Sequence, residues 1–425
     1  MRTVAAERGL NVSYDRRTVQ RWLSGTRPRP PAPTLLLEGL SRALGKLVTA
    51  QEAGLSHTPA LFVDRSWEAS PVQKVVRLAS AELNSSTGVA SDAEGFSLAT
   101  LYLPEWVSDE PSIRHGQRML PETGDVQEIF DIISMFSKGA EMHGGGHLRV
   151  PVAAYLIDHV IPLLPSDVND PDKAGLLSGA ARLILLLADM CIESGRDRSA
   201  QHYQQIAVRF AASAHDMATV AAALCAMAAH ACELGHRGTV VLSLAERAVV
   251  CARHASPAVR AQALAQLSVI QAQTGGREAL DTLTQAEHLH QLAETEPDPV
   301  LAYSLGTLHH QRARTFIALG ETTSAIRALS ASLYVRGAEE RCAASMAHAQ
   351  IAELYAMISH FEQSVAHCRC FFSAYPTLHS ARATRRFDSL CHQLRAQQHD
   401  PHVRAFLAQE EQCREQVRAG VKQDR

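Results

Sequence analysis

The sequence has few aromatic residues and no long hydrophobic run. Phe, Trp and Tyr make up 5% of its 425 residues, which disfavours a sheet-rich fold, whereas abundant alanine suits close-packed helices. The longest apolar run, residues 183–188, is bounded by Arg182 and Asp189, and no stretch reaches the roughly 18 apolar residues of a membrane span. The N-terminus carries no apolar signal core. We therefore expect no membrane segment and a cytoplasmic protein.

The patterns of common catalytic and metal sites are missing as well. The nine cysteines form no CxxC pair, which favours reduced thiols in a core. His143 and the three glycines after it resemble an esterase oxyanion loop, but no GxSxG nucleophile motif accompanies them. The same glycines separate His143 from His147, which disfavours a metal-binding helix there. We predict no enzyme, no metal site and no cofactor, and interpret the glycines as a flexible break.

Charge divides the chain into two parts. Residues 1–50 hold nine Arg or Lys and three acidic residues, a net charge of +6, and the remaining residues carry −9. A basic segment suggests a polyanionic partner for this part alone. We therefore separate a basic head from an acidic body.

The boundaries follow from composition and from helical periodicity. We expect a helix-turn-helix head over residues 1–55 and a linker over 56–120, with one transient helix at 72–83 and a mobile stretch at 84–97. Apolar residues recur with a period of 3.6 from about residue 126, which predicts a helical body over 121–413 and a short tail over 414–425. The predicted fold class is all-α.

The body contains a degenerate internal repeat of two helices joined by a turn residue. The five predicted turns lie at Gly195, Gly235, Gly275-Gly276, Gly320 and Ser359, spaced by about 40 residues. Small residues such as Ala188, Ala228 and Ala313 precede them and allow the helices to approach closely. Such helix pairs bury their apolar faces only by stacking on their neighbours. The pattern resembles the tetratricopeptide repeat and implies an α-solenoid, with a generic helical bundle as the alternative.

In tetratricopeptide arrays the first helix of each pair lines a concave groove. The resemblance therefore implies a groove formed by Asp189, Glu193, Glu233, Gln271, His310, Arg314 and Glu353. Four acidic side chains against one arginine favour a cationic or amide-rich peptide, or a docked protein, as the groove's partner. A solvated acidic helix face is the alternative.

The head contains a candidate recognition helix at residues 13–24. Ser13 is a plausible N-cap, and Ser24-Gly25 ends the helix. Val19, Trp22 and Leu23 form one apolar stripe, which we expect to be buried. The other side carries the side chains that read base edges and phosphates in DNA, namely Arg16, Arg17, Gln20 and Arg21, followed by Arg27.

This segment resembles the recognition helix of Cro/repressor-type helix-turn-helix regulators. The shared pattern is Thr18-Val19, then Trp22, Gly25 and Pro28, and residues 30–55 resemble the closing helices of that family. Only residues 2–10 precede the junction, so we expect the first helix of such a head to be missing, through the choice of start site or through loss from the gene.

The whole chain resembles a group of bacterial regulators, of actinomycete type, that join such a head to tetratricopeptide repeats. The blocks at residues 135–147 and 155–162 contribute to this resemblance. It implies a transcriptional regulator that binds double-stranded DNA, with a possible homodimer and a peptide or protein ligand in the groove. The alternative is an interaction module whose truncated head no longer binds DNA.

Overall fold

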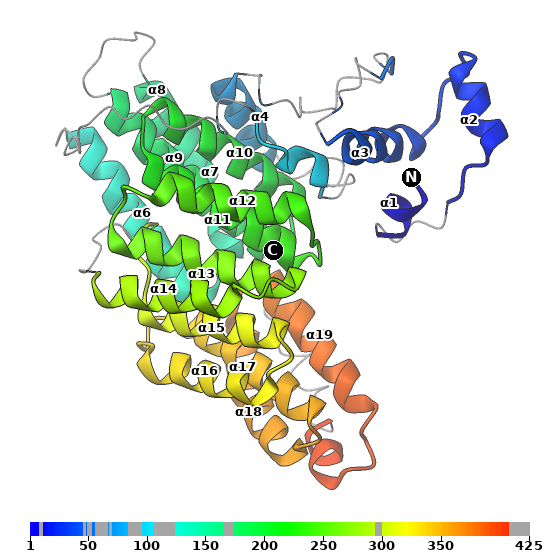
Figure 1. Ribbon diagram of the computed structural model, residues 1–425. Helices are drawn as coiled ribbons and strands as arrows, with labels where there is room; N and C mark the ends of the chain where they lie inside the picture. Colours follow the sequence, from blue (N-terminus) through cyan, green and yellow to red (C-terminus); the bar gives the residue numbers. More distant parts are fainter. Residues whose placement is uncertain are drawn as a thin grey trace.

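The computed structural model describes residues 1–7, 12–45, 70–83, 96–104, 124–164, 173–293 and 300–407, together with Val48, residues 53–55, Trp67 and Val107. All regular elements of these residues are helical, and consecutive helices of the body pack in pairs (Figure 1). The predicted all-α, solenoid-like architecture is confirmed.

The head consists of α1 (Arg2–Glu7), α2 (Arg16–Leu23) and α3 (Ala32–Leu44). Val4 and Ala5 of α1 pack against Leu35 of α3, and all three side chains are buried. Helix α2 lies at the outer end of the head (Figure 1) and contributes no buried residue.

Part of the predicted linker is built into the body. The expected helix at 72–83 is present as α4 (Pro71–Leu83), and its side chains Val75, Leu78 and Ala79 belong to the main hydrophobic core. A short 3-10 helix, η2 (Leu98–Leu101), also contributes Leu101 to that core. Both segments therefore pack as parts of the body, which differs from a linker with a transient helix. The predicted mobile stretch lies outside the described residues, apart from positions 96 and 97.

After α4 and η2 the body continues with α6 (Gly124–His143), followed by η3 (Gly146–Leu148) and α7 (Arg149–Tyr155). A π-helical turn, η4 (Leu156–Val160), and α8 (Ile161–Leu163) continue the same helix. Helix α6 packs against α9 (Lys173–Glu193), and Ile129 and Ile133 bury its inner side.

Five helix pairs follow and descend in sequence order in Figure 1. The pairs are α9 with α10 (Asp197–Ser213), α11 (Met217–Glu233) with α12 (Thr239–Ala252), α13 (Pro257–Thr274) with α14 (Ala279–Gln291), α15 (Leu305–Ala318) with α16 (Thr322–Val335), and α17 (Arg341–Met357) with α18 (Phe361–Ala374). Each predicted turn contains a residue of left-handed backbone, with φ between 61° and 83° at Gly195, Gly235, Gly275, Gly320 and Ser359. The turn register is thereby confirmed.

Further helical segments follow the fifth pair, and residues 401–407 add Val403 and Phe406 to the last core. After η5 (Tyr375–Thr377), α19 (Ala381–Arg395) packs its apolar side, including Phe387, Leu390 and Leu394, against α17 and α18. Its other side carries arginines toward α9 and α11, which positions the candidate site described below.

Helix α9 is long and apolar enough to cross a membrane by length and composition. In the structure 89% of its most apolar window is buried inside the protein. The helix is therefore the central element of the core.

Candidate functional site

Helix α2 presents the predicted DNA-contacting side chains to solvent. Arg16, Arg17, Gln20 and Arg21 are all exposed, as is Arg27 beyond the helix. The N-cap is Asp15 rather than Ser13, because the Asp15 carboxylate accepts a hydrogen bond from the Thr18 N–H at 2.8 Å. This hydrogen bonding holds the pKa of Asp15 below its usual value, so the cap remains charged.

The apolar side of α2 is not the buried stripe that we expected. Trp22 is half-buried, with its ring centroid 5.1 Å from that of Tyr14, and Val19 is likewise half-buried. Leu23 is 83% exposed. The prediction of a buried stripe is therefore wrong for this chain, because α1 and α3 pack against each other and α2 contributes nothing to their core.

A buried carboxylate joins the head to the body. Glu38 of α3 is 1% exposed. Its carboxylate accepts hydrogen bonds from the Ser97 hydroxyl and the Leu98 N–H, and forms an ion pair with Arg42. The side-chain amide of Gln201 on α10 accepts a hydrogen bond from the Ser97 N–H at 3.1 Å and donates one to the Ser97 carbonyl at 2.7 Å. The 97–101 segment therefore connects α3 to α10 through hydrogen bonds that sequence periodicity does not reveal.

The predicted groove residues all lie on the first helices of the pairs. Asp189 and Glu193 come from α9, Glu233 from α11, Gln271 from α13, His310 and Arg314 from α15, and Glu353 from α17. Gln271 is buried, at 8% exposure, and the other six retain contact with solvent.

Sequence reasoning missed three arginines of α19, of which two pair with groove acids and one with the nearby Asp197. The Arg382 guanidinium of α19 lies 3.1 Å from the Glu193 carboxylate and 3.0 Å from that of Glu233. Arg386 pairs with Glu353. Arg385 lies 3.9 Å from Asp197, the first residue of α10. The available signal was the amphipathic pattern of residues 381–395, with arginines at 382, 385 and 386 on one side.

Asp189 has the most perturbed carboxyl group among the acidic residues of α9 and α11. Its side chain reaches solvent but lies among the inner helices, and this partial burial, with Glu193 and Glu233 nearby, raises its pKa to about 6 despite Arg382. Burial alone would raise the pKa of Glu233 too, but Arg382 and Arg314 hold it below its usual value.

Arginines of the same surface also surround His310 on α15. Burial and four surrounding arginines, at positions 314, 336, 386 and 382, lower the pKa of His310 to about 3. His310 is therefore neutral at physiological pH and offers its ring nitrogens for hydrogen bonds. The inner surface thus combines an acidic part on α9 and α11 with a basic part on α15 and α19.

The three glycines after His143 are a packing site in the structure, not a flexible break. The His379 N–H donates to the His143 carbonyl at 2.7 Å, and the Gly146 N–H donates to the His379 carbonyl at 3.0 Å. A Cβ at Gly146 would lie 2.6 Å from the His379 oxygen, and one at Gly145 would lie 2.9 Å from the Met190 side chain. Only glycine permits this close approach.

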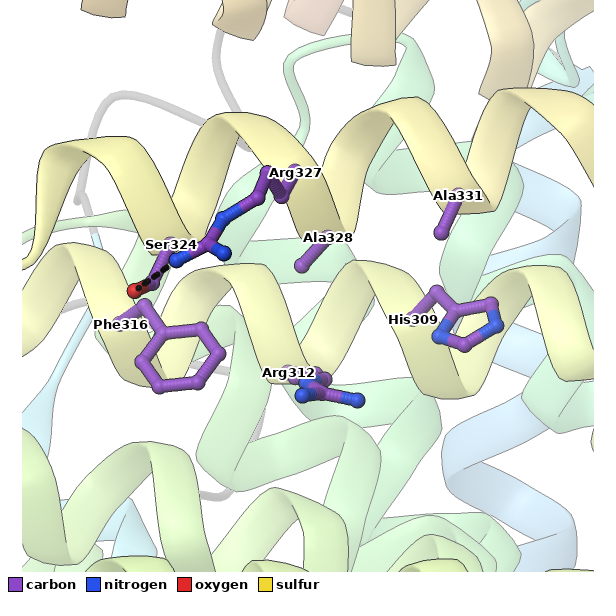
Figure 2. A pocket seen from close by; sticks show the side chains of 7 residues that line it. All are labelled: His309, Arg312, Phe316, Ser324, Arg327, Ala328 and Ala331. Carbon is purple, nitrogen blue, oxygen red and sulfur yellow. Dashed lines mark hydrogen bonds between the residues drawn. The ribbon is translucent and has the colours of Figure 1, made fainter.

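A separate depression of about 230 Å³ lies between α15 and α16 (Figure 2). Arg312 lies over the Phe316 ring at 5.6 Å and pairs with Glu287 at 3.2 Å, while Arg327 donates to Ser324 at 3.4 Å. Its cations are thus held by partners within the protein, and we assign it no ligand. Among the described residues no group of three His, Cys, Asp or Glu side chains could hold a metal ion.

Comparison with known families gives one match. Residues 1–56 match a family model described as the SP15 N-terminal domain, and these bounds nearly coincide with the basic head. None of the curated proteins matches the chain. The comparison thus shows that the head is similar to this domain, while the helical body lies outside the match.

Proposed function

We propose that the protein is a transcriptional regulator that binds double-stranded DNA through α2 and responds to a peptide or protein partner on the inner surface of its solenoid. The observation that carries the proposal is the exposed side of α2, where three arginines and a glutamine stand on one short, capped helix. Arginine and glutamine form paired hydrogen bonds with guanine and adenine edges in the major groove.

The connection between head and body supports a regulatory role. Glu38 fixes the head to the 97–101 segment, and Gln201 and Gln205 fix that segment to α10. A rearrangement of the solenoid at α10 would therefore reach the head through buried hydrogen bonds. A solenoid that moves on binding a partner would in this way change the orientation of α2.

DNA titration of the full chain tests the proposal. The affinity for a labelled random duplex is measured by fluorescence anisotropy at two salt concentrations. The logarithm of the binding constant should fall with the logarithm of the salt concentration, with a slope of about 0.9 per phosphate contact. Arg17→Ala and Arg21→Ala should each weaken binding by about 1–3 kcal/mol on a specific site, selected from a random duplex library. Arg277→Ala, an exposed arginine of the solenoid, is the matched control and should bind like the parent chain.

The second candidate function is an interaction module that does not bind DNA. The exposure of Leu23 and the absence of buried residues in α2 favour it, because a recognition helix is normally supported by its own core. Equal anisotropy for the parent chain, Arg17→Ala and Arg21→Ala at low salt would select this function over DNA binding.

A further inference from the structure

The start and the end of the solenoid meet at one seam. Arg382 and Arg385 of α19 reach Glu193, Glu233 and Asp197, at the ends of α9 and α11 and the start of α10. Arg382 and Glu193 are 189 positions apart in the sequence. The contacts of residues 378–386 therefore close the row of helix pairs into a ring.

Backbone contacts complete the seam. His379 exchanges hydrogen bonds with His143 and Gly146, and the rings of His147 and His379 lie 4.4 Å apart between centroids. A Cβ at Gly195 would lie 3.5 Å from the Ala381 Cβ. Residues 378–386 thus follow the surface formed by the α6–η3 junction and the end of α9.

No hydrophobic core crosses this seam among the described residues. Helix α9 belongs to the main core, which runs from α4 to α13, whereas α19 belongs to a separate core with α17 and α18. Elsewhere along the row, neighbouring cores share a helix: α13 contributes to two of them, and so does α17. Helix α17 also packs against α6 at this seam, without a shared apolar cluster. Closure therefore lacks the common apolar core that joins the successive pairs.

The ion pairs of the seam lie at its edge, with some of their atoms buried and others in contact with water. The side chains of Arg382 and Glu233 are 29% and 34% exposed, and that of Arg385 is 50% exposed. Arg382 bridges two carboxylates, so these pairs contribute more than an isolated surface pair, but the seam lacks the shared apolar core that joins the helix pairs on either side of it. Local opening favours such regions of few apolar contacts.

We propose that residues 378–386 are a latch, and that the solenoid opens and closes along the seam where α19 and α17 meet α9 and α6, without unfolding of its helix pairs. Opening would leave Asp189, Glu193 and Glu233 together and unpaired by α19, as an acidic surface that suits an arginine-bearing segment of a partner. The latch itself follows from the contacts alone, and only the class of partner rests on the proposed function.

Hydrogen exchange of the full chain, followed by mass spectrometry, tests the latch without DNA or a partner. The seam amides, those of Gly146 and His379, donate hydrogen bonds across the seam and should exchange about tenfold faster than the amides of α17 and α18, because the seam opens locally. Arg382→Ala should accelerate the seam amides further and leave α17 and α18 unchanged. Arg369→Ala, an exposed arginine on α18, should change neither group.

A disulfide across the seam provides the converse test. Gly195→Cys with Ala381→Cys places two Cβ atoms at a spacing suited to a disulfide. The oxidised form should slow exchange of the seam amides to the level of α17, whereas the reduced form of the same variant should not. Comparing two redox states of one variant cancels the strain of cysteine at position 195, and the parent chain under the same oxidant controls for its own cysteines. The latch is refuted if the seam exchanges as slowly as α17 in the parent chain, or if Arg382→Ala accelerates all helices equally.

Discussion

Removal of the Glu82 carboxylate should destabilise the body strongly. Glu82, on α4, is 2% exposed and pairs with Arg149, which is itself 8% exposed, and with Arg196 at 3.3 Å. Burial and the neighbouring Arg196 already lower the pKa of Arg149, so the site disfavours further positive charge. Glu82→Ala leaves two adjacent guanidinium groups without this carboxylate, and loss of one partner of a buried pair costs about 3–5 kcal/mol.

Urea unfolding followed by far-ultraviolet circular dichroism measures this loss. Gln73→Ala, an exposed position on the same helix, is the control and should stay within about 0.5 kcal/mol of the parent. The double variant Glu82→Leu with Arg149→Met removes both buried charges and should recover most of the lost stability. If Glu82→Ala shifts the unfolding midpoint no more than Gln73→Ala does, α4 does not belong to the core and the segment is a linker after all.

Three further variants test other parts of the structure. The pKa of Asp189 is about 6 in the fold against a usual 3.8, so ionisation of this group lowers the free energy of unfolding as the pH rises between these values. Asp189→Asn should therefore raise the free energy of unfolding in urea at pH above about 7, by about 0.5–1 kcal/mol given the exposure of the side chain. At pH below about 4 it should have no such effect. Gly146→Ala should cost about 1–3 kcal/mol by pushing away the His379 carbonyl, in urea unfolding, while Gly124→Ala, with open space around it, should not. Trp22→Ala should lower stability by only about 1 kcal/mol in thermal melting, because the indole is half-buried; a loss above about 3 kcal/mol would show that α2 is packed.

The helical pairs were predictable because they depend on local rules. A left-handed turn residue, small residues before it and a period of 3.6 are all written within one repeat. For this reason Gly195, Gly235 and Ser359 were placed correctly from sequence. The groove residues followed from the same register, since each lies on the first helix of its pair, before the turn.

The contacts of the 97–101 segment and of the glycines after His143 depend instead on distant partners. Ser97 binds Gln201, 104 positions away, and Gly146 binds His379. Polar and glycine-rich composition is the same in a mobile linker and in a segment whose backbone is bound by another part of the chain. Glycine serves both where the backbone is conformationally free and where another segment approaches it closely. The two cases can be told apart only when the segment packed against the glycine is known.

Ring closure explains why the charge of the groove was misjudged. A row of helix pairs accumulates a small rotation at each step, so whether its ends meet depends on geometry that no single repeat specifies. Helix α19 lies beyond the fifth pair and was left out of the register, yet it brings Arg382, Arg385 and Arg386 to the acidic side chains. The same helix covers the apolar end of the α17–α18 core with Phe387. In the structure the chain itself supplies cations to these acids, so the predicted cationic partner remains a prediction that concerns the proposed open ring.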